Sequence, residues 1–183
     1  HRDLHSFPTR RSSDLVKAGF SVSETALFMT LFIGFGAVSQ WPLGWLSDKI
    51  DRRKVILLCC VSVISICIVL ASFEFTNTIL LILSALVGAC TLPLYSLGVA
   101  QANDRLEPKQ MISASGTIVL VFSVFAALGP FTMSYFLEQF EMFGFMLYMG
   151  IVHLFIAITI LMMMMITQDV DESEQTDFQV MGQ

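Results

Sequence analysis

Charged side chains are scarce in this sequence. They make up 14% of its 183 residues, whereas a soluble domain normally carries about a quarter. The formal net charge is −5 and no basic patch extends beyond one loop, so the sequence does not predict a nucleic-acid partner. Apolar side chains are abundant instead: 55% of the residues are hydrophobic, and 16 of them are Phe. This composition argues against a soluble domain and favours a chain that lies in a lipid bilayer.

Residue sets that hold metals or perform catalysis are also missing. No Cys/His spacing is typical of a metal site, and no Ser/His/Asp set or pair of carboxylates near one face suits an enzyme. The four cysteines all lie inside apolar segments, at Cys59, Cys60, Cys67 and Cys90. We therefore predict reduced thiols that face lipid or neighbouring helices, no metal, no cofactor and no enzymatic activity.

The first fifteen residues lack the apolar core of a signal peptide. Residues 5–15 are basic and serine-rich, and they resemble one reading frame of a sequencing-adapter oligonucleotide. We interpret residues 1–15 as an artefact, with a genuine extension as the alternative. On the first interpretation the chain is a fragment of a longer protein.

Five apolar stretches are each long enough to cross a bilayer. About 20 residues at a rise of about 1.5 Å span a hydrocarbon core of about 30 Å. Only helices satisfy their own backbone in that medium, and these stretches are apolar nearly all round, unlike the helices of a soluble bundle. We expect an all-α, polytopic transmembrane bundle with spans at about residues 24–46, 54–73, 78–99, 112–136 and 143–166.

Local signals mark helix starts and bends. Ser21 and Glu24 have the spacing of a capping box, and Pro93 and Pro130 are expected to kink the third and fourth spans. Glu24 also has an alternative role in proton coupling, because intramembrane carboxylates often carry protons. His153 leaves the same choice between a structural hydrogen bond and proton coupling.

Basic residues predict the orientation. Downstream of the first span, every Lys and Arg falls in residues 49–54 or 105–109, which are alternate links between spans. The positive-inside rule places these links in the cytoplasm; Lys17, on the opposite side, is an exception. The acidic tail at residues 167–183 is then cytoplasmic, and it is expected to be solvated.

The polar loop between the first two spans carries the most specific motif. It resembles the signature loop of major facilitator superfamily (MFS) transporters, written G-x-x-x-D-[RK]-x-G-[RK]-[RK]. The matching residues are Gly44, Asp48, Lys49, Arg52 and Arg53, whereas Asp51 stands in place of the second glycine. Residues 40–53, together with 92–96 and 129–130, are further similar to a poorly characterised bacterial subgroup of this family.

The resemblance implies a fold and a function. Family members have twelve spans in two halves; four spans follow the loop here, which matches spans 8 to 12 in the C-terminal half. It implies an integral protein of the bacterial inner membrane that moves a small solute by alternating access, with the missing N-terminal half as its partner. Proton coupling, uptake or efflux, and the identity of the solute stay open. The alternative is a sensor or regulator with the same fold that binds ligand without net transport.

The loop is predicted to act as a conformational latch. Asp48 lies at a helix C-terminus, where the helix dipole disfavours an anion, and Arg52 is four residues on, within helical reach. The resemblance implies that Asp48 also meets the N-terminal end of a helix in the opposite half. The alternative is a topology anchor of snorkelling cations. Asp51 is expected to stiffen the turn or to pair with Arg53.

The resemblance also implies that spans 8, 10 and 11 line a central cavity. Polar residues of those spans are then candidates to face the solute: Gln40, Thr91, Tyr95, Ser115, Thr117 and Ser123. Hydrogen bonds between helices are the alternative role for each. No Lys or Arg lies inside these spans, and an amphiphile, a sugar and another metabolite all remain open as cargo.

Overall fold

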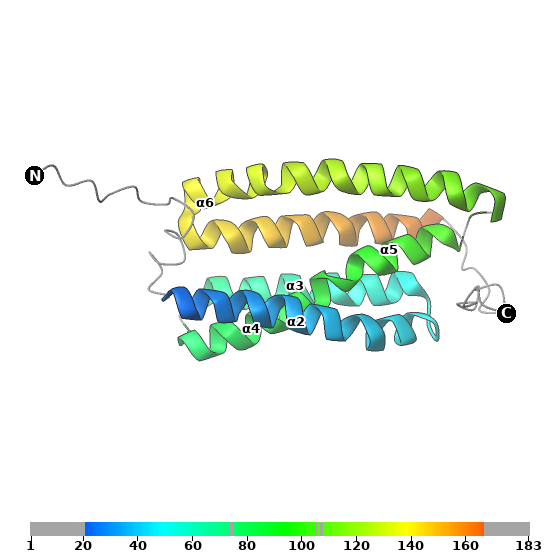
Figure 1. Cartoon of the computed structure of the whole chain (residues 1–183). Helices are drawn as coiled ribbons and strands as arrows, with labels where there is room; N and C mark the ends of the chain where they lie inside the picture. Colours follow the sequence, from blue (N-terminus) through cyan, green and yellow to red (C-terminus); the bar gives the residue numbers. More distant parts are fainter. Residues whose placement is uncertain (1–20, 74, 105, 107, 167–183) are drawn as a thin grey trace, which may run out of the picture.

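The chain folds into helices that lie roughly parallel or antiparallel. The computed structural model describes residues 21–73, 75–104, 106 and 108–166, and no strand occurs in that part. Its helices are α2 (Val22–Ser47), α3 (Arg52–Ser72), α4 (Asn77–Thr91), α5 (Pro93–Asn103) and α6 (Pro108–Ile166) (Figure 1). The predicted all-α fold is confirmed. The expectations for residues 1–15 and for the acidic tail concern residues outside the described part.

Five of the resulting segments are long and apolar enough to cross a membrane, as the sequence predicts. They are Val22–Ser47, Arg52–Ser72, Asn77–Asn103, Lys109–Phe140 and Phe143–Ile166. Helices α4 and α5 thus form one span, and α6 contributes two.

Helix α6 doubles back on itself as a hairpin (Figure 1). The Thr132 and Tyr148 hydroxyl oxygens lie 3.1 Å apart, although sixteen residues along a straight helix would cover about 24 Å. Gly144 allows the two arms to approach closely, since a methyl group there would collide with the carbonyl of Phe136. We call Lys109–Phe140 the first arm and Phe143–Ile166 the second arm.

The buried core lies between α3, α5 and the second arm. Val55, Cys60, Leu97 and Ala157 belong to one cluster of buried apolar residues. A second cluster joins Val63 and Cys67 of α3 to Val87 of α4. Large apolar side chains also cover the outer surface of the helices, as expected where lipid replaces water as the solvent.

Helices α2 and α4 approach each other through glycines. A methyl group on Gly88 would collide with the carbonyl of Phe32, and one on Gly36 would collide with the side chain of Leu92. Small residues allow such close packing in membranes. A methyl group on Gly44, farther along α2, would meet nothing within 4 Å.

Two segments are poorly covered by the rest of the described chain. Only 6% of the apolar window of α2 and none of that of the first arm is buried. The first arm contacts α5 at Tyr95, whose ring centroid lies 4.5 Å from that of Phe122.

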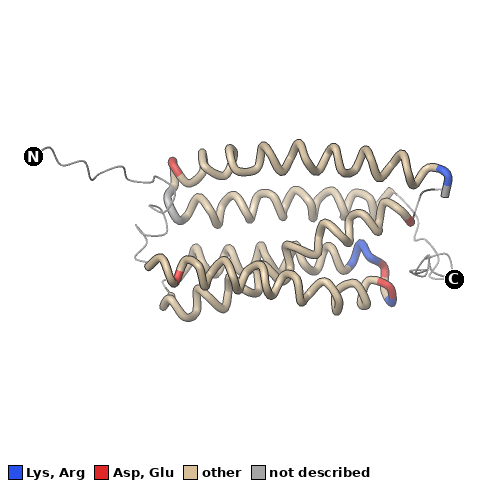
Figure 2. The backbone as a smooth tube through the Cα atoms, viewed as in Figure 1, with Lys and Arg blue, Asp and Glu red and all other residues tan. Residues whose placement is uncertain are grey.

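Charges segregate to the two ends of the bundle (Figure 2). The described Lys and Arg residues all lie at the end where α2 meets α3 and where α6 begins, namely Lys49, Arg52, Arg53, Lys54 and Lys109. Glu24 and Glu138 lie at the opposite end. The two cationic links therefore share one end of the described molecule.

Candidate functional site

The loop between α2 and α3 is built by two helix caps. Asp48 caps the C-terminus of α2, and its backbone N–H donates to the carbonyl of Gly44 at 3.1 Å. Asp51 is the N-cap of α3, and its carboxylate accepts from the backbone N–H of Arg53 at 3.0 Å. An aspartate is among the best N-caps because it satisfies a backbone donor that has no partner within the helix. The turn is therefore short and defined.

Arg52 connects the C-terminal end of α2 to that of α5, at the cationic end of the bundle. One terminal nitrogen lies 2.9 Å from Oδ1 of Asp48, as the i, i+4 spacing predicts, and the other lies 3.4 Å from Oδ2 of Asp104. Asp104 is the C-cap of α5. The side chains of Arg52 and Asp104 are 7% and 10% exposed, whereas that of Asp48 is 56% exposed. One guanidinium thus bridges α2 and α5, and Asp48 keeps a face that is open to a further partner.

Asp51 performs both of the roles expected for it. Besides capping α3, its Oδ2 lies 2.8 Å from a terminal nitrogen of Arg53, and its Oδ1 lies 3.0 Å from Nε of Arg53. Arg53 is buried. A glycine at position 51 would provide neither the side-chain acceptor for the Arg53 backbone N–H nor this carboxylate.

Lys49 lies on the exposed side of the loop. Its Nζ is 3.8 Å from the centroid of the Trp45 ring, a cation–π contact that is worth about 0.5–1 kcal/mol at an exposed site. Lys54 is also exposed. Together with the open space beside Gly44, these residues leave one side of the loop uncovered in the described chain.

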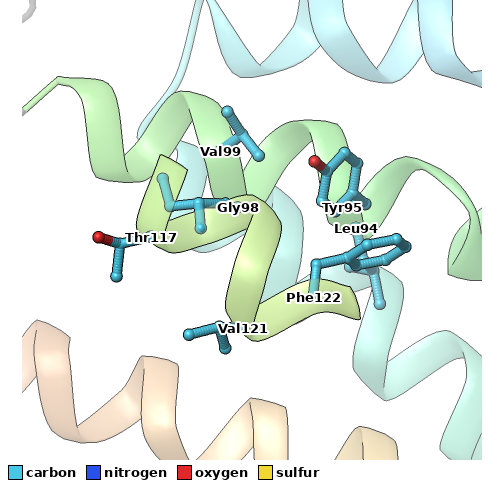
Figure 3. A pocket seen from close by; sticks show the side chains of 8 residues that line it. Leu94, Tyr95, Gly98, Val99, Thr117, Val121 and Phe122 are labelled. Atoms are coloured by element: carbon cyan, nitrogen blue, oxygen red, sulfur yellow. The ribbon is translucent and has the colours of Figure 1, made fainter. Parts of the chain in front are cut away.

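A wide-open cavity on the surface of the described chain lies between α5 and the first arm (Figure 3). Its volume is about 360 Å³, and no charged residue lines it. Tyr95 and Phe122 lie side by side in Figure 3, whereas the Thr117 oxygen points away from them and donates to the carbonyl of Ser113 at 3.2 Å. The lining consists of Leu94, Tyr95, Gly98, Val99, Thr117, Ile118, Val121 and Phe122.

The structure brings together only two of the six predicted cavity residues. Tyr95 and Thr117 line this cavity, while Gln40, Thr91, Ser115 and Ser123 do not. Ser115 and Ser123 donate to carbonyls of their own helix, at 2.7 and 2.8 Å, and Gln40 is exposed on α2. Thr91 instead contacts His153 in the interior.

The two candidate proton carriers both have hydrogen-bond partners. Glu24 forms the predicted capping box with Ser21 and accepts from Nδ2 of Asn77 at 3.0 Å. His153 is 2% exposed; its Nδ1 lies 2.8 Å from the carbonyl oxygen of Met149 and its Nε2 lies 3.3 Å from Oγ1 of Thr91. These contacts account for both side chains as structural groups.

Two residues of the site escaped the sequence analysis. Asp104 directly precedes the second cationic link, and that position was the available signal. Ser39 of α2 donates to the carbonyl of Ala89 in α4 at 2.7 Å, a contact that no local pattern marks. Within the described residues, no group of three or more His, Cys, Asp or Glu side chains is placed to hold a metal ion.

Comparison with known proteins gives a consistent family. A family model described as Major Facilitator Superfamily matches residues 11–180. An uncharacterized MFS-type transporter of Enterobacter sp. (strain 638) is 29% identical over 112 residues, which cover 61% of this chain and 28% of the relative. The uncharacterized MFS-type transporter YcaD of Escherichia coli O139:H28 is 30% identical with the same coverage, and YcaD of Escherichia fergusonii is 26% identical over 113 residues. The chain thus spans 28% of the length of these relatives. No solved structure matches.

Proposed function

Since the chain belongs to the major facilitator superfamily, we propose that it is part of a secondary transporter that moves a small solute by alternating access. Its relatives carry the name of MFS-type transporters, and its five apolar segments suit an integral, multi-pass membrane protein. The bacterial inner membrane is the proposed location, because these relatives come from enterobacteria. The partner is the remainder of the transporter, including the N-terminal half.

The observation that carries this proposal is the Asp48–Arg52–Asp104 network. Arg52 is buried between the end of α2 and the end of α5. A change at Asp48 therefore alters the position of Arg52 and its contact with α5, the helix that lines the cavity. The exposed part of the Asp48 carboxylate is available to a helix end in the other half of the transporter, which is attracted because helix N-termini carry partial positive charge. The contact between Asp48 and that helix end then stabilises one conformation of the transporter and is broken in the other. The residues of the proposed latch loop are Gly44, Asp48, Lys49, Arg52 and Arg53.

The cavity lining favours an apolar or amphiphilic solute. The wall that this chain contributes has no charged residue to pair with an anion. A sugar would need several convergent hydrogen-bonding groups, whereas the Thr117 hydroxyl already donates within its own helix. The Tyr95 and Phe122 rings, whose planes are tilted by 50°, provide an apolar surface, which suits an aromatic or aliphatic body. The two residues retained as cavity-lining in this proposal are Tyr95 and Thr117.

Asp48→Asn in the full-length transporter tests the latch. The substitution weakens the attraction to Arg52 and to the opposing helix end, and a coupling of about 1–3 kcal/mol corresponds to a change in state populations of roughly 5- to 150-fold. We expect transport of fluorescent amphiphiles into sealed membrane vesicles to fall by such a factor while the amount of inserted protein stays the same. Lys109→Gln, an exposed cation outside the loop, is the matched control.

Two outcomes would contradict the proposal. Normal flux in the Asp48→Asn protein, at a normal protein level, would remove the latch. Saturable binding of the amphiphiles by the wild-type protein without any flux would instead indicate a sensor or regulator.

A further inference from the structure

An acidic segment follows the last helix of the chain. Residues 167–183 come directly after Ile166, where α6 ends. The dipole of a helix places partial negative charge at its C-terminal end, which destabilises anions there, and the last turn of α6 contains no basic residue. Any cation that stabilises the segment therefore comes from another helix. The segment carries no Lys or Arg and five carboxylates, namely Asp169, Asp171, Glu172, Glu174 and Asp177.

The first turn of α3 has the opposite excess of charge. It contains Arg52, Arg53 and Lys54 and no acidic residue, at the helix end whose partial positive charge destabilises cations. The three aspartates of this end of the bundle contact the two arginines. Lys54 is exposed and makes no ion pair within the described part of the chain. Its ammonium group is thus open to a further carboxylate.

Packing brings the end of α6 to this turn of α3. Ile160 of the second arm belongs to the same buried cluster as Val55, and Met163 packs against that cluster. Val55 directly follows Lys54 in the sequence. The last turn of α6 therefore lies beside the first turn of α3, and the acidic segment leaves the helix next to an exposed lysine.

The length of the chain allows the contact. Asp169 and Asp171 are three and five residues past Ile166, and an extended chain of that length covers about 10–18 Å. Lys109 is also exposed, but the first arm has 32 residues and the second 24, so Lys109 lies about 12 Å farther out than Ile166. A contact with Lys54 orders fewer residues and costs less conformational entropy than one with Lys109.

We infer that residues 167–183 fold back on the first turn of α3, with their carboxylates beside the ammonium group of Lys54. The docked segment brings anions to the end of the molecule where, in the proposed function, Asp48 attracts a helix end of the other half. It would compete with Asp48 for that helix end. This consequence rests on the proposed function, whereas the docking rests on charge and packing, and its test needs no transport.

Carbodiimide cross-linking of the full-length transporter in lipid nanodiscs measures the contact, because the reagent joins an amine to a carboxylate that touches it. Mass spectrometry should find residues 169–177 joined to Lys54 about threefold more often than to Lys109, a factor that one exposed ion pair corresponds to. The preference should disappear at about 1 M salt, where charges are screened beyond about 3 Å. Equal yields at low salt, or a preference that persists at high salt, would overturn the inference.

A spin label on Ser173→Cys, with any other accessible cysteine replaced, reports the mobility of the segment. Lys54→Gln should raise the mobile fraction of the label about threefold, and Lys54→Arg, which keeps the charge, should retain the wild-type spectrum. Lys109→Gln removes the same charge at the same end of the bundle and is the matched control. An unchanged spectrum in Lys54→Gln, or an equal change in Lys109→Gln, would contradict docking at Lys54. The cross-linking needs no substitution, so it decides the question if a variant does not fold.

Discussion

At the scale of single residues, the loop contains two buried arginines, and aspartate carboxylates contact both of them. Arg52 bridges two carboxylates that lie 56 positions apart in sequence, Asp48 and Asp104. The planar guanidinium suits this task because its nitrogens point to both partners at once, which the single ammonium of lysine does not do. Asp104 should therefore contribute to the latch as strongly as Asp48.

Asp104→Asn is expected to impair the full-length transporter in the same manner as Asp48→Asn. It leaves the shape of the α5 cap nearly unchanged but removes one of the two charges that Arg52 contacts. A coupling of about 1–3 kcal/mol predicts a loss of roughly 5- to 150-fold in the conformational equilibrium. Initial transport rates at matched protein levels measure it. Equal rates in the variant and the wild type would mean that Arg52 needs only Asp48.

Asp51→Gly should destabilise the chain, although it restores the residue of the family motif. The variant loses the N-cap of α3, and the loss of such a cap costs about 0.5–2 kcal/mol when the replacement is not itself a good cap and a few tenths when it is glycine. It also loses the carboxylate beside the buried Arg53. Asp51→Asn keeps a side-chain cap and an oxygen acceptor beside Arg53 but loses the charge, so a larger drop in the thermal midpoint for Gly than for Asn measures the cap together with that Arg53 contact. If both variants match the wild type, the Asp51 contacts contribute nothing to stability.

At the scale of helices, packing depends on where small residues meet a neighbouring backbone. Gly88 and Gly36 lie at the contact of α2 with α4, and the contact also places Ser39 against Ala89. In the sequence, Ser84 and Gly88 are small residues spaced four apart, a pattern that allows close approach on one helix face. It did not predict which backbone group of α2 would lie there, since the crossing of two helices is not a local property.

Gly88→Ala should separate α2 from α4. Its methyl group would collide with the Phe32 carbonyl, and overpacking of this kind costs about 1–3 kcal/mol. Gly34→Ala is the control on α2, because a methyl group there meets nothing within 4 Å and alanine favours a helix over glycine by about 1 kcal/mol. Thermal unfolding in detergent should therefore rank Gly34→Ala above Gly88→Ala. The reverse order would contradict the described contact.

Sequence reasoning succeeded where the cause is local. The capping box at Ser21, the Asp48–Arg52 pair and the five apolar segments all follow from spacing within one helix or one turn. It did not identify the partner of Thr91, which is four residues before Tyr95 on the same span. Thr91 contacts His153, while Tyr95 lines the cavity. Asp104 and Ser39 were missed because their partners lie far away in sequence.

At the scale of the whole molecule, the cationic ends of the described helices predict the topology. We expect Lys54 and Lys109 to face the cytoplasm, and Asn77 and Gln139 to face outward. Single cysteines at these exposed positions, in a background free of the four native cysteines, are labelled with an impermeant maleimide in intact cells. Arg52 is unsuitable for this purpose because it is buried. Strong labelling of position 54 from outside would reverse the proposed orientation.

The separation of charges in Figure 2 also has an electrical consequence. In the proposed orientation, Glu24 and Glu138 lie on the outer side, whereas the described cations lie on the inner side together with Asp48, Asp51 and Asp104. A membrane potential that is negative inside stabilises these placements of the glutamates and the cations by about 2.3 kcal/mol per charge for each 100 mV, and it opposes the placement of the three aspartates by the same amount per charge. Respiration would then help to drive the acidic turn of the α6 hairpin outward as the protein inserts. Dissipating the potential during synthesis should consequently weaken the bias toward one orientation, most of all for the two arms of α6.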